Sequence, residues 1–140
     1  MNYHETHIQV RFNEVDCYNV AWHGHYITWL EVGRNDLAGR FGLDAVQLRE
    51  LGFVGPVVNL EMKFLRPARF KDEITVRTTL RPSESATLVF VSEIVGPDRR
   101  KLASAVTTHA LTDENGVLQY KIPRQIAERL NRMTEWLRCV

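Results

Sequence analysis

The chain has 140 residues, enough for one compact domain and too few for a multidomain assembly. Apolar residues make up 44% and charged residues 25%, which is typical of a globular domain and excludes disordered, collagen-like and disulfide-rich classes. Eighteen basic and 17 acidic side chains give a net charge of +1 without a block of like charges, so the basic patch that nucleic-acid binding needs is missing.

The first part of the chain predicts a strand, a loop and a long helix. Apolar and polar residues alternate over residues 6–12, which is the period of a strand, and residues 13–19 show no period and predict a loop. A helical pattern begins at about His23, and Gly42 stands where a C-terminal glycine stop is expected. The apolar stripe of this helix comprises Tyr26, Trp29, Leu30, Gly33, Leu37 and Phe41. The small residue Gly33 predicts that another backbone comes close.

The rest of the chain predicts an antiparallel sheet between two further helices. A short helix is expected over residues 44–51, and the period of two then returns in residues 58–64, 73–80, 87–95 and 102–111. We expect these strands to pair in hairpin order, the first two half-buried. A last helix is expected to begin at Pro123, with Ile126, Leu130, Met133 and Leu137 as its apolar stripe.

These elements predict a single α+β domain over residues 1–140. Strand 87–95 is apolar on both sides, so its second face should meet the last helix or a second copy of the chain. No apolar run approaches the roughly 18 residues of a membrane-spanning helix, and the first residues lack a signal-peptide pattern. With Cys17 and Cys139 at opposite ends of the chain, we expect a reduced, cytoplasmic protein that does not bind membranes.

Chemically useful residues gather where the loop runs into the long helix. The first turn of a helix has unpaired N–H groups and the positive end of its dipole, so it can polarise a carbonyl group and stabilise an oxyanion. Gly24 would let a ligand approach this backbone. Asp16 or Glu14 in the loop can then act as a nucleophile or as a general base for water. This combination indicates acyl transfer to water, although Asp16 can also simply tether the loop.

Two stretches resemble a known family. The first contains Asp16, His23, Tyr26, Trp29, Glu31 and Arg34, and the second is the run KFLRPARFKD at residues 63–72. Together they resemble the hotdog-fold acyl-CoA thioesterases of the 4-hydroxybenzoyl-CoA thioesterase family, over residues 6–112. The resemblance implies a five-stranded antiparallel sheet wrapped around the long helix, in a homodimer or homotetramer with active sites between subunits. It implies that Asp16 is the catalytic carboxylate and that the backbone amides of His23 and Gly24 polarise the thioester carbonyl.

The resemblance also implies an acyl-CoA or aroyl-CoA substrate and no cofactor. Tyr26 and Asn59 are expected to face the substrate, and Arg66 and Arg69 are candidates to contact the CoA phosphates. Some members carry a basic cluster where this chain has only Arg81, so an acyl carrier protein remains an alternative carrier.

Several residues have a structural alternative to a chemical role. Glu31 can pair with Arg34 one turn later instead of acting in catalysis. Two residues apart on a helix, His23 and His25 diverge, so we expect no metal site. His109 on the last strand is expected to be a hydrogen-bonded sheet histidine.

Two other functions remain open for the chain as a whole. One is a non-catalytic protein of the same fold that binds acyl thioesters, in which Asp16 is structural. The other is a hotdog dehydratase, which would pair a histidine with a carboxylate at the pocket. Many members of the family have Gly at the position of Asn19, which predicts a positive φ angle there.

Overall fold

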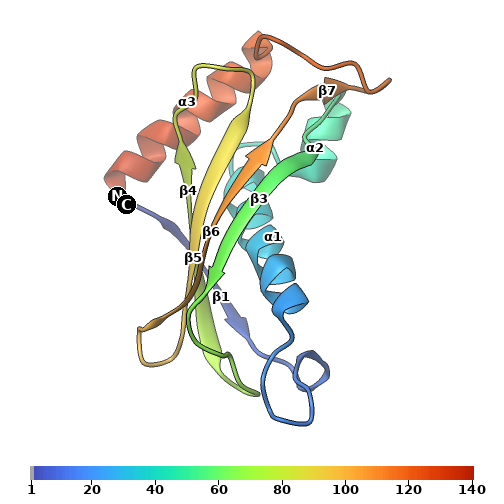
Figure 1. The fold of residues 1–140 in the computed structure, drawn as a ribbon. Coiled ribbons are helices and arrows are strands. Elements are labelled where there is room, and N and C mark those ends of the chain that lie inside the picture. The colour runs from blue at the N-terminus through green and yellow to red at the C-terminus, as the bar shows by residue number, and fades with distance from the viewer. Residues whose placement is uncertain (1) are drawn as a thin grey trace.

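The structure is a computed structural model that describes residues 2–140, and a five-stranded antiparallel sheet is its frame (Figure 1). The strands of this sheet are β1 (His4–Gln9), β3 (Val57–Phe64), β4 (Glu73–Arg81), β5 (Leu88–Val95) and β6 (Lys101–His109). A two-stranded sheet is formed by β2 (Phe53–Val54) and β7 (Thr112–Asp113), and the helices are η1 (Phe12–Glu14), α1 (His23–Gly39), α2 (Ala45–Glu50) and α3 (Arg124–Cys139). The predicted α+β hotdog architecture is confirmed.

The strand order β1-β4-β5-β6-β3 differs from the predicted hairpin order at one strand. Strands β4, β5 and β6 are joined as hairpins, but β3 pairs with β6 at the far edge and not with β4. The connection over residues 65–72 explains the difference. It crosses the end of the sheet, where Leu65 N donates to Leu102 O at 2.8 Å and Ala68 O accepts from Ala21 N at 2.9 Å.

Two expectations about the strands were wrong, one on the burial of β3 and one on the end of β1. Strand β3 is exposed along nearly its whole length, with Val58 59% exposed, because it lies at the sheet edge and no helix of this chain covers it. The first strand also ends at Gln9 and not at residue 12. Phe12 begins η1 instead, where it is exposed and packs edge-on against Phe70.

Helix α1 lies against the sheet as its apolar stripe predicts. Tyr26, Trp29, Leu30, Gly33, Leu37 and Ala38 are its buried residues. A Cβ at Gly33 would lie 2.5 Å from Cγ1 of Val76 on β4, so the atoms that come close here belong to side chains and not to another backbone. Gly42 follows the helix with a φ of 72°, as expected for the glycine stop. Helix α2 begins after Asp44, whose side chain accepts a hydrogen bond from Gln47 N.

Helix α3 packs beside α1 on the same face of the sheet. Its predicted stripe is buried in a core cluster that also contains Leu37 and Ala38 of α1 and Phe90 of β5. Of the two alternatives for the second face of the sheet, the last helix was therefore wrong, and a second copy of the chain stays a prediction.

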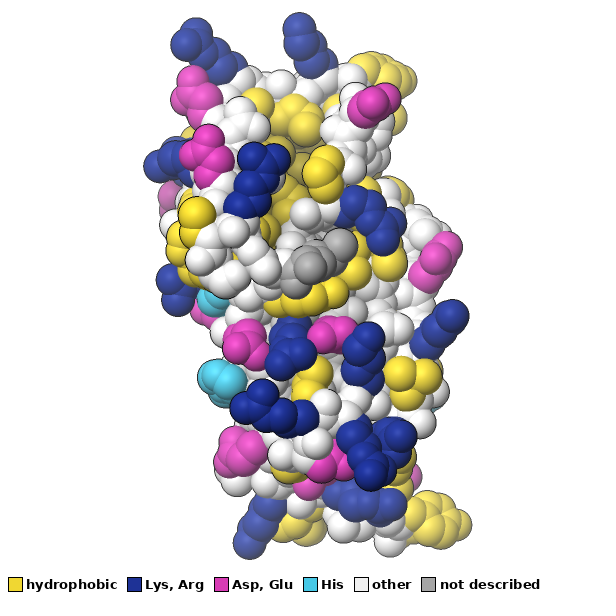
Figure 2. Space-filling model, turned by 90° about the vertical axis from the view of Figure 1, so that its left-hand side faces the viewer, with side chains coloured by type: hydrophobic (Ala, Val, Ile, Leu, Met, Phe, Trp, Pro, Cys, Tyr) yellow, Lys and Arg dark blue, Asp and Glu magenta, His cyan; other side chains and the backbone are white. Residues whose placement is uncertain are grey.

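That second face carries ion pairs instead of a covering helix. Arg77 contacts Glu5 at 3.1 Å and Glu93 at 3.2 Å, and Lys101 contacts Glu93 at 3.1 Å. Figure 2 shows side chains of both signs interleaved over the lower part of the surface it presents. Among the helices of residues 2–140, none has the length and hydropathy to cross a bilayer.

Candidate active site

An open hollow of about 440 Å³ lies at the N-terminus of α1, beside the connection after β3. Its lining residues are Asp16, Val20, Ala21, Trp22, His23, Tyr26, Phe64, Leu65, Arg66 and Pro67. The hollow is called the α1 hollow below. It brings together four of the predicted site residues, from segments up to 50 positions apart in the sequence.

The start of α1 is left without a side-chain cap. Trp22 occupies the N-cap position and makes no side-chain capping bond, although its carbonyl accepts from His25 N at 3.0 Å. The amides of His23 and Gly24 have no acceptor among residues 2–140. Ser, Thr, Asp or Asn would ordinarily satisfy such donors. Two free N–H groups at the positive end of the helix dipole can therefore bind a carbonyl oxygen or an oxyanion.

Gly24 has a different role from the one its sequence suggests. The indole of Trp22 fills the space in front of it, and any Cβ at Gly24 would overlap that ring. The space that the absent side chain leaves is therefore taken by Trp22 and is not open to a ligand on that side. Its missing side chain instead allows Trp22 to pack against the first turn.

Asp16 holds its loop with one carboxylate oxygen and leaves the other free. Its Oδ1 accepts from Tyr18 N at 2.8 Å and from Val20 N at 3.4 Å, and its backbone carbonyl accepts from Asn19 N at 3.0 Å. Among residues 2–140, no group donates a hydrogen bond to Oδ2, and the side chain is exposed. Tethering the loop, which was the structural alternative, is thus combined with a free oxygen at the hollow.

Asn19 gives this loop its turn. Its φ is 59°, which confirms the positive angle predicted at this position, and Asn tolerates it better than most residues. Its Oδ1 accepts from Phe70 N at 3.1 Å. The loop that carries Asp16 is thereby attached to the connection that carries Arg66.

Glu14, the other loop carboxylate, does not line the α1 hollow. It is 2% exposed, and it accepts hydrogen bonds from Arg11 N and from Trp29 Nε1, both at 2.8 Å. Burial acts to raise the pKa of this carboxyl group, but these hydrogen bonds and the charge of Arg11 outweigh it, so the pKa is lowered. The alternative that Glu14 is the reacting carboxylate was therefore wrong.

Tyr26 presents its ring, not its hydroxyl, to the hollow. The hydroxyl accepts from Ala68 N at 2.8 Å and donates to Arg66 O at 3.4 Å, and burial raises its pKa. Its contribution to binding is therefore apolar. The same bonds fix the backbone of the connection after β3.

The two predicted arginines border a second hollow. Arg66 lines the α1 hollow and the neighbouring one, which Arg69 also lines. Asp72 and Asp98 lie in that second hollow and reduce its positive charge. Arg66 and Pro67 are thus the residues shared by both spaces.

Asn59 does not reach the α1 hollow of its own subunit. It is three positions from Met62, which packs against the core, and it pairs in register with Thr108. Because side chains alternate along a strand, Asn59 points to the face opposite α1. Asn59 is therefore not among the residues that line the α1 hollow, and its predicted contact with substrate stays a prediction.

The aromatic wall of the hollow was incompletely predicted. Phe64 lies 5.3 Å from the ring of Tyr26 and 6.1 Å from that of His23. Trp22 and Phe64 are 58% and 49% exposed, unusual for such large rings. The sequence did contain a signal that Phe64 lies near the site. This residue stands two positions before Arg66, in the second stretch that resembles the family.

The remaining polar candidates have structural partners. His109 Nδ1 lies 3.0 Å from Gly55 O and its Nε2 lies 3.2 Å from the hydroxyl of Thr107, which confirms a hydrogen-bonded sheet histidine. Glu31 pairs with Arg34 at 3.7 Å, as its structural alternative expects. Within residues 2–140, no three His, Cys, Asp or Glu side chains gather as a metal site, and no imidazole bonds to Asp16.

Comparison with known proteins gives consistent matches over most of the chain. Residues 10–136 match the family described as the thioesterase-like superfamily. The chain is 25% identical over 114 residues to a Bacillus subtilis protein named "Putative acyl-CoA thioesterase YneP", covering 81% of this chain and 83% of the relative.

Solved structures share the fold. A DHNA-CoA thioesterase of Staphylococcus aureus superposes with a TM-score of 0.85 at 21% identity, covering 96% of this chain and 93% of that one. A hypothetical protein of Thermus thermophilus gives a TM-score of 0.82 at 32% identity, covering 92% of this chain and 98% of that one.

Proposed function

The chain belongs to the thioesterase-like superfamily, and from this premise we propose that it hydrolyses the thioester of an acyl or aroyl acid with CoA to the free acid and the thiol. One observation supports the proposal: Asp16 lines the same hollow as His23, the first residue of α1, whose backbone amide is unpaired among residues 2–140. A base and a pair of oxyanion donors are the groups that acyl transfer to water needs.

The chemistry runs through the thioester carbonyl. Its oxygen accepts from the His23 and Gly24 amides, which stabilise the negative charge that develops when a nucleophile attacks. In one route, Asp16 Oδ2 takes a proton from water as the water oxygen bonds to the carbonyl carbon. The C–S bond then breaks, and the thiolate leaves with its electron pair and gains a proton. In the other route Asp16 itself attacks, expels the thiolate and forms an anhydride that water hydrolyses.

Arg66 is the residue we propose to guide the carrier. It borders both the α1 hollow and the neighbouring hollow lined by Arg69, so a chain extending from the thioester sulfur can pass between them. Their guanidinium groups can donate hydrogen bonds to phosphate oxygens. An acyl carrier protein also presents its acyl group on a phosphate-linked arm, and thioesters of both carriers belong in the assay.

Asp16→Ala is the central test. We expect kcat to fall roughly a hundred- to ten-thousand-fold, because the base or nucleophile is lost, while the melting temperature changes little. Hydrolysis of aromatic, short and long acyl-CoAs is followed through release of the free thiol. Glu128→Gln, which removes an exposed carboxylate of α3, is the matched control and should retain full activity. Undiminished turnover by Asp16→Ala would refute the assignment.

One observation favours a second function. Asp16 Oδ1 already tethers its loop, which is the role expected in a protein that binds acyl thioesters without cleaving them. The same substrates separate the two functions. If none is cleaved while equilibrium dialysis still detects binding, the binding protein is the better description.

We further propose that the chain acts as a homodimer joined through β3. The outer edge of this strand is unpaired within residues 2–140, and its apolar side chains are exposed. Such an edge is a template for pairing with another strand. The exposed free thiols of Cys17 and Cys139 suit a reducing compartment, and they support our expectation of a cytoplasmic protein.

A further inference from the structure

A second cavity lies at the other end of α1 and shares no residue with the α1 hollow. Its volume is about 140 Å³, and it is a partly open space lined by residues of α1, α2, α3, β2, β5 and β6. We call it the α3 cavity. Its lining residues are Arg34, Asn35, Ala38, Leu43, Ala45, Leu48, Val54, Gly55, Pro56, Leu88, Phe90, His109, Leu130 and Met133.

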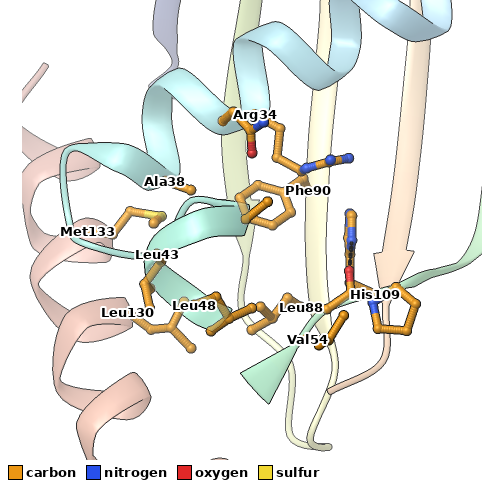
Figure 3. A pocket seen from close by; sticks show the side chains of 14 residues that line it. Arg34, Ala38, Leu43, Leu48, Val54, Leu88, Phe90, His109, Leu130 and Met133 are labelled. Atoms are coloured by element: carbon orange, nitrogen blue, oxygen red, sulfur yellow. Dashed lines mark hydrogen bonds between the residues drawn. The ribbon is translucent and has the colours of Figure 1, made fainter. Parts of the chain in front are cut away.

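The two ends of the α3 cavity differ in chemistry. Figure 3 shows Arg34 and His109 on one side, and Leu43, Leu130 and Met133 on the other, with the ring of Phe90 between them. Arg34 is the one charged side chain among the lining residues. An apolar space with a single cation at its end favours a ligand that has an apolar body and one negative group.

Arg34 is poorly satisfied by its own chain. Its side chain is 17% exposed, and its one ion-pair partner among residues 2–140 is Glu31. The carboxylate of Glu31 lies 3.7 Å away and is itself 55% exposed, so it offers weak compensation. Burial lowers the pKa of the guanidinium, the direction expected for a cation removed from water. A buried guanidinium ordinarily binds a carboxylate through two hydrogen bonds.

His109 supplies no competing charge. Burial and the nearby charge of Arg34 lower its pKa, so near neutral pH the ring is uncharged. Its Nδ1 then donates to Gly55 O, and its Nε2 accepts from the hydroxyl of Thr107. Both ring nitrogens are therefore used, and Arg34 alone is left to bind an anion.

The volume limits the size of the ligand. Apolar cavities near this volume hold one benzene ring. Arg34 lies eleven residues after His23, or about 16 Å along the axis of α1, so a ligand here is well separated from the reacting thioester.

We propose that the α3 cavity is a second ligand site that binds a one-ring aromatic carboxylate, with the ring among the leucines and Phe90 and the carboxylate on Arg34. This proposal does not depend on the proposed thioesterase activity. The α3 cavity shares no lining residue with the α1 hollow, so the two sites can be occupied separately.

The test compares benzoate with benzamide, which has the same ring and nearly the same shape without the charge. Isothermal titration calorimetry on the full chain should show benzoate binding at least about tenfold more tightly. Arg34→Gln should remove that difference. Arg124→Gln, at a 91% exposed arginine of α3, is the matched control and should preserve it.

The position of the ligand is read from methyl NMR spectra. Benzoate should shift the methyl signals of Leu48, Leu130 and Met133 through its ring current, and leave those of Val20 and Leu65 at the α1 hollow in place. The same shifts are expected in Asp16→Ala, which separates this site from the reaction.

Several results would overturn the proposal. They are equal affinity for benzoate and benzamide, absence of benzoate binding, an affinity unaffected by Arg34→Gln, or shifts confined to Val20 and Leu65. If Arg34→Gln does not fold, the affinities of the unaltered protein for benzoate and benzamide decide whether the proposal holds.

Discussion

Asp16 and Glu14 stand two positions apart in one loop, and the fold uses them in opposite ways. Glu14 points into the core and ties the loop to Trp29, whereas Asp16 remains exposed at the α1 hollow. The sequence could place both beside the helix start, because that follows from chain order. It could not distinguish them, because Trp29, the partner of Glu14, lies 15 residues further along the chain, and only the folded structure brings the two together.

Glu14→Gln should therefore destabilise the protein without altering the reaction chemistry. We expect the free energy of unfolding to fall by about 1–3 kcal/mol, since the hydrogen bonds from Arg11 and Trp29 meet a weaker acceptor. Chemical denaturation followed by fluorescence measures this loss. Glu128→Gln should change the free energy by less than about 0.5 kcal/mol.

The same variant should change how stability depends on pH. The folded pKa of Glu14 lies below its usual value of 4.5, so its contribution to stability is present above that pH. It is lost as the pH falls through the folded pKa. In Glu14→Gln, the decline of the unfolding free energy below pH 4.5 should be shallower than in the unaltered chain. Parallel declines in the two proteins would contradict this account.

At the scale of elements, helices were predicted better than strand positions. The stripe of α1 and that of α3 specify which face is buried, and the structure buries those residues. The alternation along β3 predicted which of its side chains lie on the α1 side of the sheet, but it did not predict the position of the strand within the sheet. Strand order depends on contacts between distant segments, here the connection that binds Leu102 and Ala21, and no local period reports them.

Gly33 joins two elements and gives a prediction at this scale. In Gly33→Ala the new Cβ would lie 2.5 Å from Val76 Cγ1 and 3.0 Å from Thr78 Oγ1, so α1 or β4 must move. We expect a loss of roughly 1–3 kcal/mol in thermal or urea unfolding, despite the higher helix propensity of Ala.

Gly39→Ala is the natural comparison. Its Cβ would meet only the side chain of Asp44, at 3.2 Å, and this exposed end of the helix can adjust. We expect a change of less than about 1 kcal/mol. Equal losses in both variants would show that helix propensity, and not the contact with β4, determines the effect.

Considered as a whole, the sheet has one helix-covered face, one ion-paired face and two edge strands, β1 and β3. Strand β3 exposes apolar side chains at its edge, which is the observation behind the proposed dimer. Composition and charge could not reveal this, because both are average for a globular domain. Asn59 is an example. The sequence predicts on which face of its strand this side chain lies, but it does not predict which residues of a second subunit would contact it.

Val58→Lys should separate the subunits. Lysine on a strand edge opposes pairing with a second strand, so light scattering should record the monomer mass where the unaltered chain gives the dimer. Val46→Lys on α2, at a residue 68% exposed, adds the same charge away from the edge and should leave the mass unchanged. An unaltered mass in Val58→Lys would exclude β3 as the contact.

The loop of Asp16 is tied to the connection of Arg66 at two points, by Ala21 N to Ala68 O and by Phe70 N to Asn19 Oδ1. The hydroxyl of Tyr26 on α1 accepts from Ala68 N and holds the same connection against the helix. Segments joined in this way are expected to open and close together. A carrier bound at Arg66 would therefore also restrain the loop that holds the Asp16 carboxylate, so that recognition of the distant half of a substrate would influence its reacting end.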